Sequence, residues 1–74
     1  MEQENYKKLA TTLIKLEMVK AGIGYGELVE RLAEIGVVDT VSGVTQKILR
    51  GTYSAAFLIQ FCKALGIDSI KLDI

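Results

Sequence analysis

The sequence TVSGVTQKILRG, residues 40–51, has the pattern of a short helix with a capping residue at its start and a glycine at its end. Thr40 or Ser42 can accept hydrogen bonds from the first helical turn. Gly51 can adopt the left-handed conformation in which many helices end. The apolar residues follow the spacing of one helical face, and they are Val41, Val44 and Ile48. We therefore predict a helix over residues 41–50.

Glycines divide the rest of the chain into three further helical patterns. An apolar stripe covers residues 4–21, and a shorter one covers residues 25–35 and ends at Gly36. The pattern over residues 54–65 is apolar around most of its circumference, with Thr52 or Ser54 as its capping residue. A chain of 74 residues suffices for one domain. We predict a single all-α domain, residues 1–74, with helices at about 4–21, 25–35, 41–50 and 54–65.

Residues 67–74 form a tail in which apolar and polar residues alternate. Ile70, Leu72 and Ile74 share one side, and Lys71 and Asp73 share the other. A period of two is typical of an extended strand, yet a lone strand has no partner inside a helical domain. Two interpretations stay open. The tail pairs with the same segment of a second subunit, or it packs on its own domain as an irregular arm.

The composition argues against an enzyme. The chain has no histidine and a single cysteine, so it can form neither an internal disulfide nor a structural zinc site. Cys62 lies in the most apolar helix with no histidine to activate it. The glycine-rich residues 22–26 join two helices and lack the lysine of a phosphate loop. We expect no catalytic site, no cofactor, no metal and no small-molecule substrate.

The sequence also bears on location. A lone thiol in a small domain without disulfides indicates a reducing compartment. No apolar run approaches the ~20 residues that span a bilayer, and the first residues are acidic and polar, unlike a signal peptide. We expect a cytoplasmic protein without membrane contact.

The charges are balanced but unevenly distributed. Nine basic and nine acidic residues give a net charge of zero, which counts against a nucleic-acid-binding protein. However, residues 40–67 contain no acid, and Lys47, Arg50 and Lys63 lie within them. We therefore expect one end of the domain to be locally positive.

Two segments resemble known families. The sequence VTQKILRG, residues 44–51, followed by ALGI, residues 64–67, resembles the phage-repressor-like helix-turn-helix family over about residues 9–67. RGTYSAAF, residues 50–57, is similar to a segment of a group of short bacterial proteins of unassigned function. This chain has Leu49 where repressor-like members often have glutamate, and its connector at residues 36–40 is longer and more apolar than a tight turn needs. The resemblance implies a four-helix, repressor-like helix-turn-helix domain with a short extended tail.

The resemblance also implies a set of DNA contacts. The helix over residues 41–50 would enter the major groove, and its candidates for contacts with base edges are Ser42, Thr45, Gln46 and Lys47. Gln46 suits adenine, and Lys47 suits guanine or phosphate. At the end of the helix and in the following loop, the candidates for contacts with the DNA backbone are Arg50, Thr52 and Tyr53.

A homodimer is the simplest explanation of the high apolar content, since half of the residues are hydrophobic. The residues expected at its interface are Phe57, Leu58, Phe61, Ile70 and Leu72. Three phosphate contacts give a salt slope of only about −2.7, so a monomer would bind DNA weakly and a dimer would double the contacts. We predict a small bacterial transcriptional regulator that binds double-stranded DNA as a homodimer, or an uncharacterised protein of that fold. The alternative is a protein-interaction module of the same fold that does not bind DNA.

Overall fold

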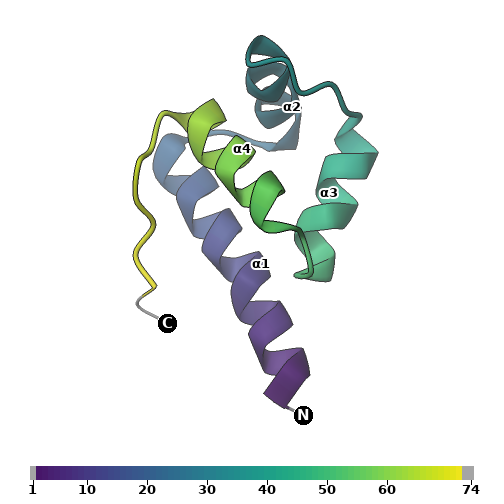
Figure 1. The fold of residues 1–74 in the computed structure, drawn as a ribbon, viewed down its shortest axis with the longest axis vertical. Coiled ribbons are helices and arrows are strands. Elements are labelled where there is room, and N and C mark those ends of the chain that lie inside the picture. The colour runs from purple at the N-terminus through teal and green to yellow at the C-terminus, as the bar shows by residue number, and fades with distance from the viewer. Residues whose placement is uncertain (1, 73–74) are drawn as a thin grey trace.

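Four helices account for most of the chain in the computed structural model, which describes residues 2–72 (Figure 1). In chain order they are α1 (Glu2–Ala21), α2 (Tyr25–Glu34), α3 (Val41–Arg50) and α4 (Ala55–Leu65). No strand occurs among residues 2–72. The prediction of an all-α fold with four helices is confirmed, and each observed helix end lies within two residues of the predicted one.

Local signals explain where α3 and α4 begin and end. The Thr40 hydroxyl accepts a hydrogen bond from the Gly43 N–H at 2.9 Å, and the Ser54 hydroxyl accepts one from the Phe57 N–H at 3.0 Å. These two residues, rather than Ser42 and Thr52, are therefore the caps. The helices end at Gly51 and Gly66, whose φ angles of 69° and 72° lie in the left-handed region that favours glycine.

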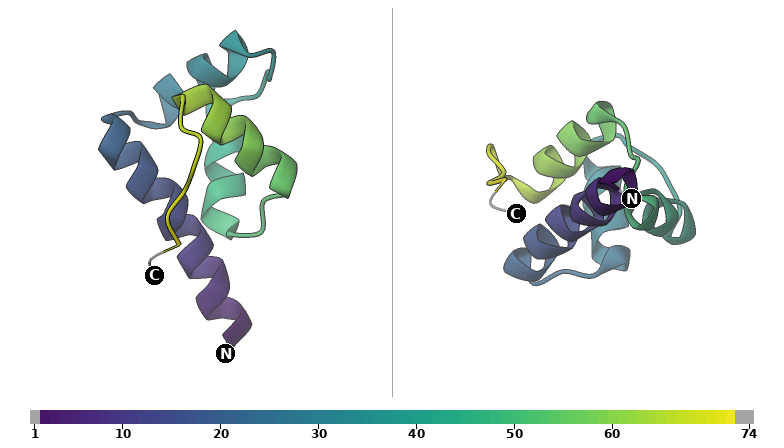
Figure 2. Two further views of the ribbon diagram at one scale, coloured as in Figure 1. Left: turned by 60° about the vertical axis from the view of Figure 1, so that its left-hand side comes forward. Right: turned by 90° about the horizontal axis from the view of Figure 1, so that it is seen from below.

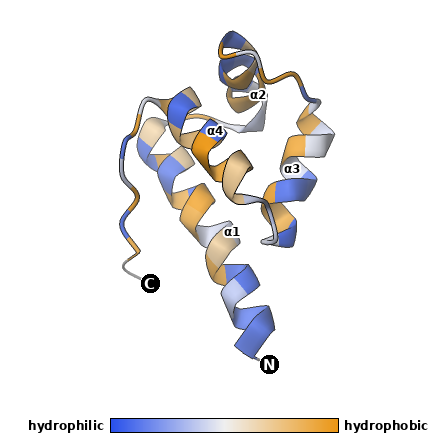
Figure 3. Cartoon of the chain, viewed as in Figure 1, coloured by the Kyte–Doolittle hydropathy of each residue, from blue (hydrophilic) through white to orange (hydrophobic). Residues whose placement is uncertain are grey.

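The core consists of apolar side chains from all four helices. Its buried members are Ile14, Met18, Leu28, Leu32, Val44, Ile48, Phe57 and Phe61. Helix α1 packs against α3, and α2 packs against both α3 and α4. Figure 3 shows that the first turns of α1 are hydrophilic, in contrast to the hydrophobic middle of α4. Within the described residues, no helix has the length and hydropathy needed to cross a membrane.

Two residues expected at an oligomer interface are instead part of this core. Phe57 is 4% exposed and Phe61 is 0% exposed, so neither ring is accessible to a second subunit. The expectation of an interface through these two rings is therefore wrong. It failed because α4 uses them to pack against the other helices of its own chain. Leu58 and Ile70 are half-buried, and Leu72 remains 74% exposed.

The tail runs beside α1 as an irregular extended segment (Figures 1 and 2). Residues 67–70 line an apolar groove with α4, and Leu72 lies near Tyr6 and Leu9 of α1. In the single chain the tail thus packs as an arm, one of the two interpretations of its alternating sequence. Residues 73–74, which include Ile74, lie outside the described residues, and pairing with a second subunit remains a prediction.

Candidate nucleic-acid interface

The residues on the exposed side of α3 can be identified from the positions of its buried residues. Val44 and Ile48 are both 0% exposed and fix the direction of the core. Successive residues turn by about 100° around a helix, which places four exposed residues on the opposite side. We call them the outer face of α3: Ser42, Gln46, Leu49 and Arg50. Three of the predicted DNA contacts therefore share one surface, with Gln46 near its centre.

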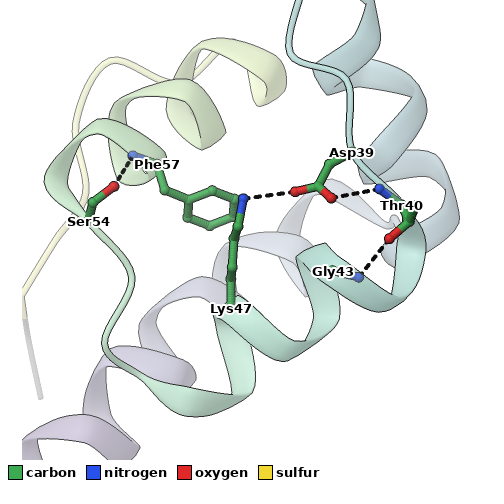
Figure 4. Close-up of polar contacts among 6 residues, drawn as sticks. All are labelled: Asp39, Thr40, Gly43, Lys47, Ser54 and Phe57. Atoms are coloured by element: carbon green, nitrogen blue, oxygen red, sulfur yellow. Dashed lines mark hydrogen bonds and ion pairs between the residues drawn. The ribbon is translucent and has the colours of Figure 1, made fainter.

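Thr45 and Lys47 lie on opposite flanks of the helix rather than on its outer face. Thr45 is half-buried. The Lys47 ammonium donates a hydrogen bond to the Asp39 carboxylate at 2.8 Å and lies 5.5 Å from the centre of the Phe57 ring (Figure 4). Carboxylate and aromatic face both attract a cation. The charge of Lys47 is therefore offset within the chain.

Asp39 has a second partner, because its carboxylate also accepts a hydrogen bond from the Thr40 N–H at 2.7 Å. The hydrogen bond from Lys47, followed by the one from Thr40, lowers the pKa of Asp39. Sequence reasoning did not select Asp39, although it directly precedes the cap residue Thr40. Its position was the available signal, because the start of a helix favours a carboxylate and Lys47 follows within two to three helical turns.

Tyr53 holds two parts of the fold together. Its hydroxyl donates a hydrogen bond to the Ala10 carbonyl at 2.7 Å, and its ring centre lies 5.7 Å from that of Phe57. Burial is the main cause of its raised pKa. The structure thus directs the Tyr53 hydroxyl towards α1, away from the outer face of α3. Thr52, the neighbouring candidate, is exposed.

The last turn of α3 packs tightly on α1. A Cβ atom at Gly51 would overlap the backbone carbonyl of Lys7, so only glycine fits there without a shift of the backbone. The Thr11 hydroxyl donates a hydrogen bond to the Ile48 carbonyl at 2.6 Å. This close approach forms a groove of about 390 Å³, the α1–α3 groove, which is lined by Glu4, Lys7, Lys8, Thr11, Thr12, Leu49 and Arg50. Sequence reasoning missed Lys7 and Lys8, whose only signal was two adjacent basic residues in the first helix.

No cluster of potential metal ligands occurs within residues 2–72. Burial, and to a lesser extent Glu17, raises the pKa of the Cys62 thiol. Cys62 therefore has less thiolate at neutral pH than an exposed cysteine, and thiolate is the reactive form.

The comparisons with known proteins give a single family. A family model described as "Domain of unknown function (DUF6471)" matches residues 6–70, which include α2, α3, α4 and most of α1. No curated protein and no solved structure matches the chain. The matched family has no assigned function, and the match does not support the resemblance to repressors.

Proposed function

The chain belongs to the DUF6471 family, and because that family has no assigned function we propose one from the geometry: a small dimeric regulator that binds double-stranded DNA through α3. The observation on which this depends is the outer face of α3. The Ser42 hydroxyl, the Gln46 amide and the Arg50 guanidinium lie together on a helix whose opposite side buries Val44 and Ile48 in the core. A surface helix presented in this way suits the major groove, which is about 12 Å wide.

The packing of α2 on α3 supports a helix-turn-helix arrangement. Leu28 and Leu32 of α2 share the core with Val44 and Ile48 of α3. The core thus supports α3 from behind and leaves its polar face outward. In helix-turn-helix proteins the second helix of such a pair contacts base edges, and the first crosses the DNA backbone.

Each residue of the outer face has a contact that its chemistry suits. The Gln46 amide can form two hydrogen bonds with adenine, and the Leu49 side chain, 53% exposed, suits a thymine methyl group. Ser42 lies in the first turn and can contact base edges or phosphate. Arg50 has no ion-pair partner among residues 2–72, so its guanidinium is available for phosphate.

The proposal includes a homodimer in the bacterial cytoplasm. A chain without net charge makes few phosphate contacts, and two copies double them. Exposed apolar side chains on α1, α4 and the tail offer a dimer surface, and they include Tyr6, Leu16, Ile59 and Leu72. With Phe57 and Phe61 buried, we assign the interface to this surface together with Leu58 and Ile70.

The test is a DNA selection followed by a binding measurement. Wild-type protein is incubated with random duplexes at low salt, and the affinity for the enriched duplex is measured by fluorescence anisotropy. Gln46→Ala combined with Arg50→Ala should weaken binding at least tenfold, since a good base contact alone contributes about 1–3 kcal/mol. Lys15→Ala, a charge change on α1 outside the α1–α3 groove and outside the outer face of α3, is the control and should have little effect. Failure to enrich or bind any duplex would overturn the proposal.

A protein-interaction module is the second candidate, and one observation favours it. The connector before α3 and the start of that helix expose aliphatic side chains, with Val38 at 88%, Val41 at 48% and Ile35 at 41%. A patch of this kind suits an apolar partner. If no duplex is bound, Val38→Asp combined with Ile35→Asp should abolish an association that is detected by sedimentation velocity. An association unchanged in this variant would exclude the patch.

A further inference from the structure

The α1–α3 groove brings together cations from two distant parts of the sequence. Lys7 and Lys8 come from the second turn of α1, and Arg50 comes from the last residue of α3. Glu4 is the only acid among the residues that line the groove. The lining thus has three cations against one carboxylate, although the chain as a whole has no net charge.

Most of this positive charge has no partner within the described chain. Neither Lys8 nor Arg50 forms an ion pair with any of residues 2–72. Lys7 pairs with Glu4 at 3.6 Å, but the Glu4 side chain is 64% exposed. Such an exposed pair contributes little to stability and exchanges readily for a stronger ligand. Lys47, by contrast, is held by Asp39 at 2.8 Å.

The backbone around the groove is held in place before any ligand arrives. Gly51 lies against the Lys7 carbonyl, Thr11 is bonded to the Ile48 carbonyl, and Tyr53 is bonded to the Ala10 carbonyl. These contacts fix the first half of α1 against the end of α3. A ligand therefore needs to order only the ends of the lysine and arginine side chains, which lowers the entropic cost of binding.

We propose that the α1–α3 groove binds phosphate oxygens of the DNA backbone, and that Lys7 and Lys8 are contacts of α1 with the same duplex that α3 reads. The inference rests on the proposed function. Leu49 and Arg50 belong both to the groove and to the outer face of α3, so the two surfaces are continuous. Lysine and arginine are the usual ligands of backbone phosphate. The same chemistry would also accept a free polyphosphate.

The main test is the salt dependence of DNA binding. Each phosphate contact contributes about 0.9 to the slope of log affinity against log salt concentration. In Lys7→Gln combined with Lys8→Gln, the slope should be shallower by about 1.8 for each subunit bound. Between about 50 and 200 mM salt, each variant subunit would then lose about 12-fold less affinity than a wild-type subunit.

The matched control is Lys15→Gln combined with Lys20→Gln. It makes the same charge change on the same helix, at positions that do not line the groove. Its slope should equal that of the wild type. Glutamine and lysine have nearly equal helix propensity, so both pairs of substitutions preserve α1, which circular dichroism can check. A wild-type slope in the Lys7/Lys8 variant would overturn the groove as a backbone site while the proposed function stands.

A second arm distinguishes the two sources of phosphate and the two proposals. Inorganic tripolyphosphate is titrated into each protein by calorimetry. If the wild type binds tripolyphosphate but no duplex, and the Lys7/Lys8 variant loses that binding, the groove takes free polyphosphate and both the backbone assignment and the proposed function fail. If neither tripolyphosphate nor duplex binds, both fail as well.

Glu4→Gln changes the groove in the opposite direction. It removes the one carboxylate that lines the groove and releases Lys7. Affinity for duplex at about 50 mM salt should rise a few-fold, because one repulsive charge is lost and one cation is gained. This variant needs no basic residue to be removed, so it remains informative if the lysine substitutions disturb folding. Unchanged or weaker binding would contradict the proposal.

Discussion

The two ends of α3 differ in what the fold places beside a basic side chain. At the first end, the Asp39 carboxylate of the connector pairs with the Lys47 ammonium, which reaches back from the last turn of the helix, and Thr40 and Gly43 complete the cap. At the last end, Arg50 has no ionic partner among residues 2–72, and α1 adds Lys7 and Lys8 beside it. Lys47 and Arg50 are three positions apart on one helix, yet only Arg50 is available to a ligand. The partners that the fold supplies therefore decide which basic residues can form a binding surface, and their spacing in the sequence does not.

The largest expected effect is a loss of stability from a substitution at the last end of α3, where that end packs on α1. Gly51→Ala adds a Cβ atom at a positive φ and against the Lys7 carbonyl. The left-handed conformation costs about 1–3 kcal/mol for a residue other than glycine, and the overlap with backbone adds about as much again. We expect a loss of about 3 kcal/mol or more in the free energy of unfolding, measured by urea denaturation.

Gly66→Ala is the matched control for this substitution. Gly66 also ends a helix at positive φ, but a Cβ atom there would meet nothing within 4 Å. Its loss should be about 1–2 kcal/mol, from backbone conformation alone. Equal losses at the two positions would show that the close approach to α1 contributes nothing.

The next effect concerns how the last end is attached to α1. Tyr53→Phe removes the hydrogen bond to the Ala10 carbonyl and should cost about 1 kcal/mol of stability. DNA affinity should stay within about twofold, because the hydroxyl faces α1. Tyr25→Phe removes a hydroxyl that forms no hydrogen bond with residues 2–72 and that lies outside the dimer surface, so it should change neither quantity. A large loss of affinity with unchanged stability would restore Tyr53 as a phosphate contact.

A smaller effect is expected when Lys47 loses its ionic partner at the first end and becomes as available as Arg50 at the last end. Asp39→Asn should release Lys47 and steepen the salt slope by about 0.9 for each subunit bound, so that each subunit loses about 3.5-fold more affinity between about 50 and 200 mM salt. Gly43→Ala is a second route to this result, since its methyl group would displace the Asp39 carboxylate. In a Lys47→Gln background, neither substitution should change the slope. A change in that background would show that Asp39 acts on the interface without Lys47.

The smallest expected effect is the pH dependence of the stability that the Asp39–Lys47 ion pair provides. The pKa of Asp39 is lowered in the folded chain, so its contribution to stability is present above the ordinary value of about 3.9 and is lost as pH falls through the folded-state pKa. A carboxyl titration by NMR should place the midpoint of Asp39 below about 3.9. In Lys47→Gln the midpoint should move up towards that value. A wild-type midpoint at or above it would contradict the pairing.

The sequence predicts the helices well because their signals are local. Thr40, Gly51, Ser54 and Gly66 mark helix ends through hydrogen bonds and backbone preferences that span only a few residues. The outer face of α3 follows from the same spacing, and the resemblance to helix-turn-helix proteins is what marked Gln46 and Arg50 on it as DNA contacts. The part of the candidate site that lies within one helix was therefore predictable.

The remaining features depend on contacts between helices. The approach of Lys7 to Gly51 requires α1 to cross the end of α3, and no local pattern indicates which turn it will meet. The burial of Phe57 and Phe61 has the same origin, since an apolar helix can face its own domain or a second copy. The pairing of Asp39 with Lys47 also depends on the path of the connector, which brings residue 39 beside a helical residue eight positions later.

The seam between α1 and α3 has a consequence for folding kinetics. The hydrogen bonds from Thr11 to Ile48 and from Tyr53 to Ala10 join residues that are 37 and 43 positions apart. Closing a loop of about 40 residues costs about 3 kcal/mol in chain entropy, whereas α2, α3 and α4 meet through short connections. We expect α1 to dock last, after the rate-limiting step. Substitutions in the seam should then speed unfolding and leave the folding rate nearly unchanged.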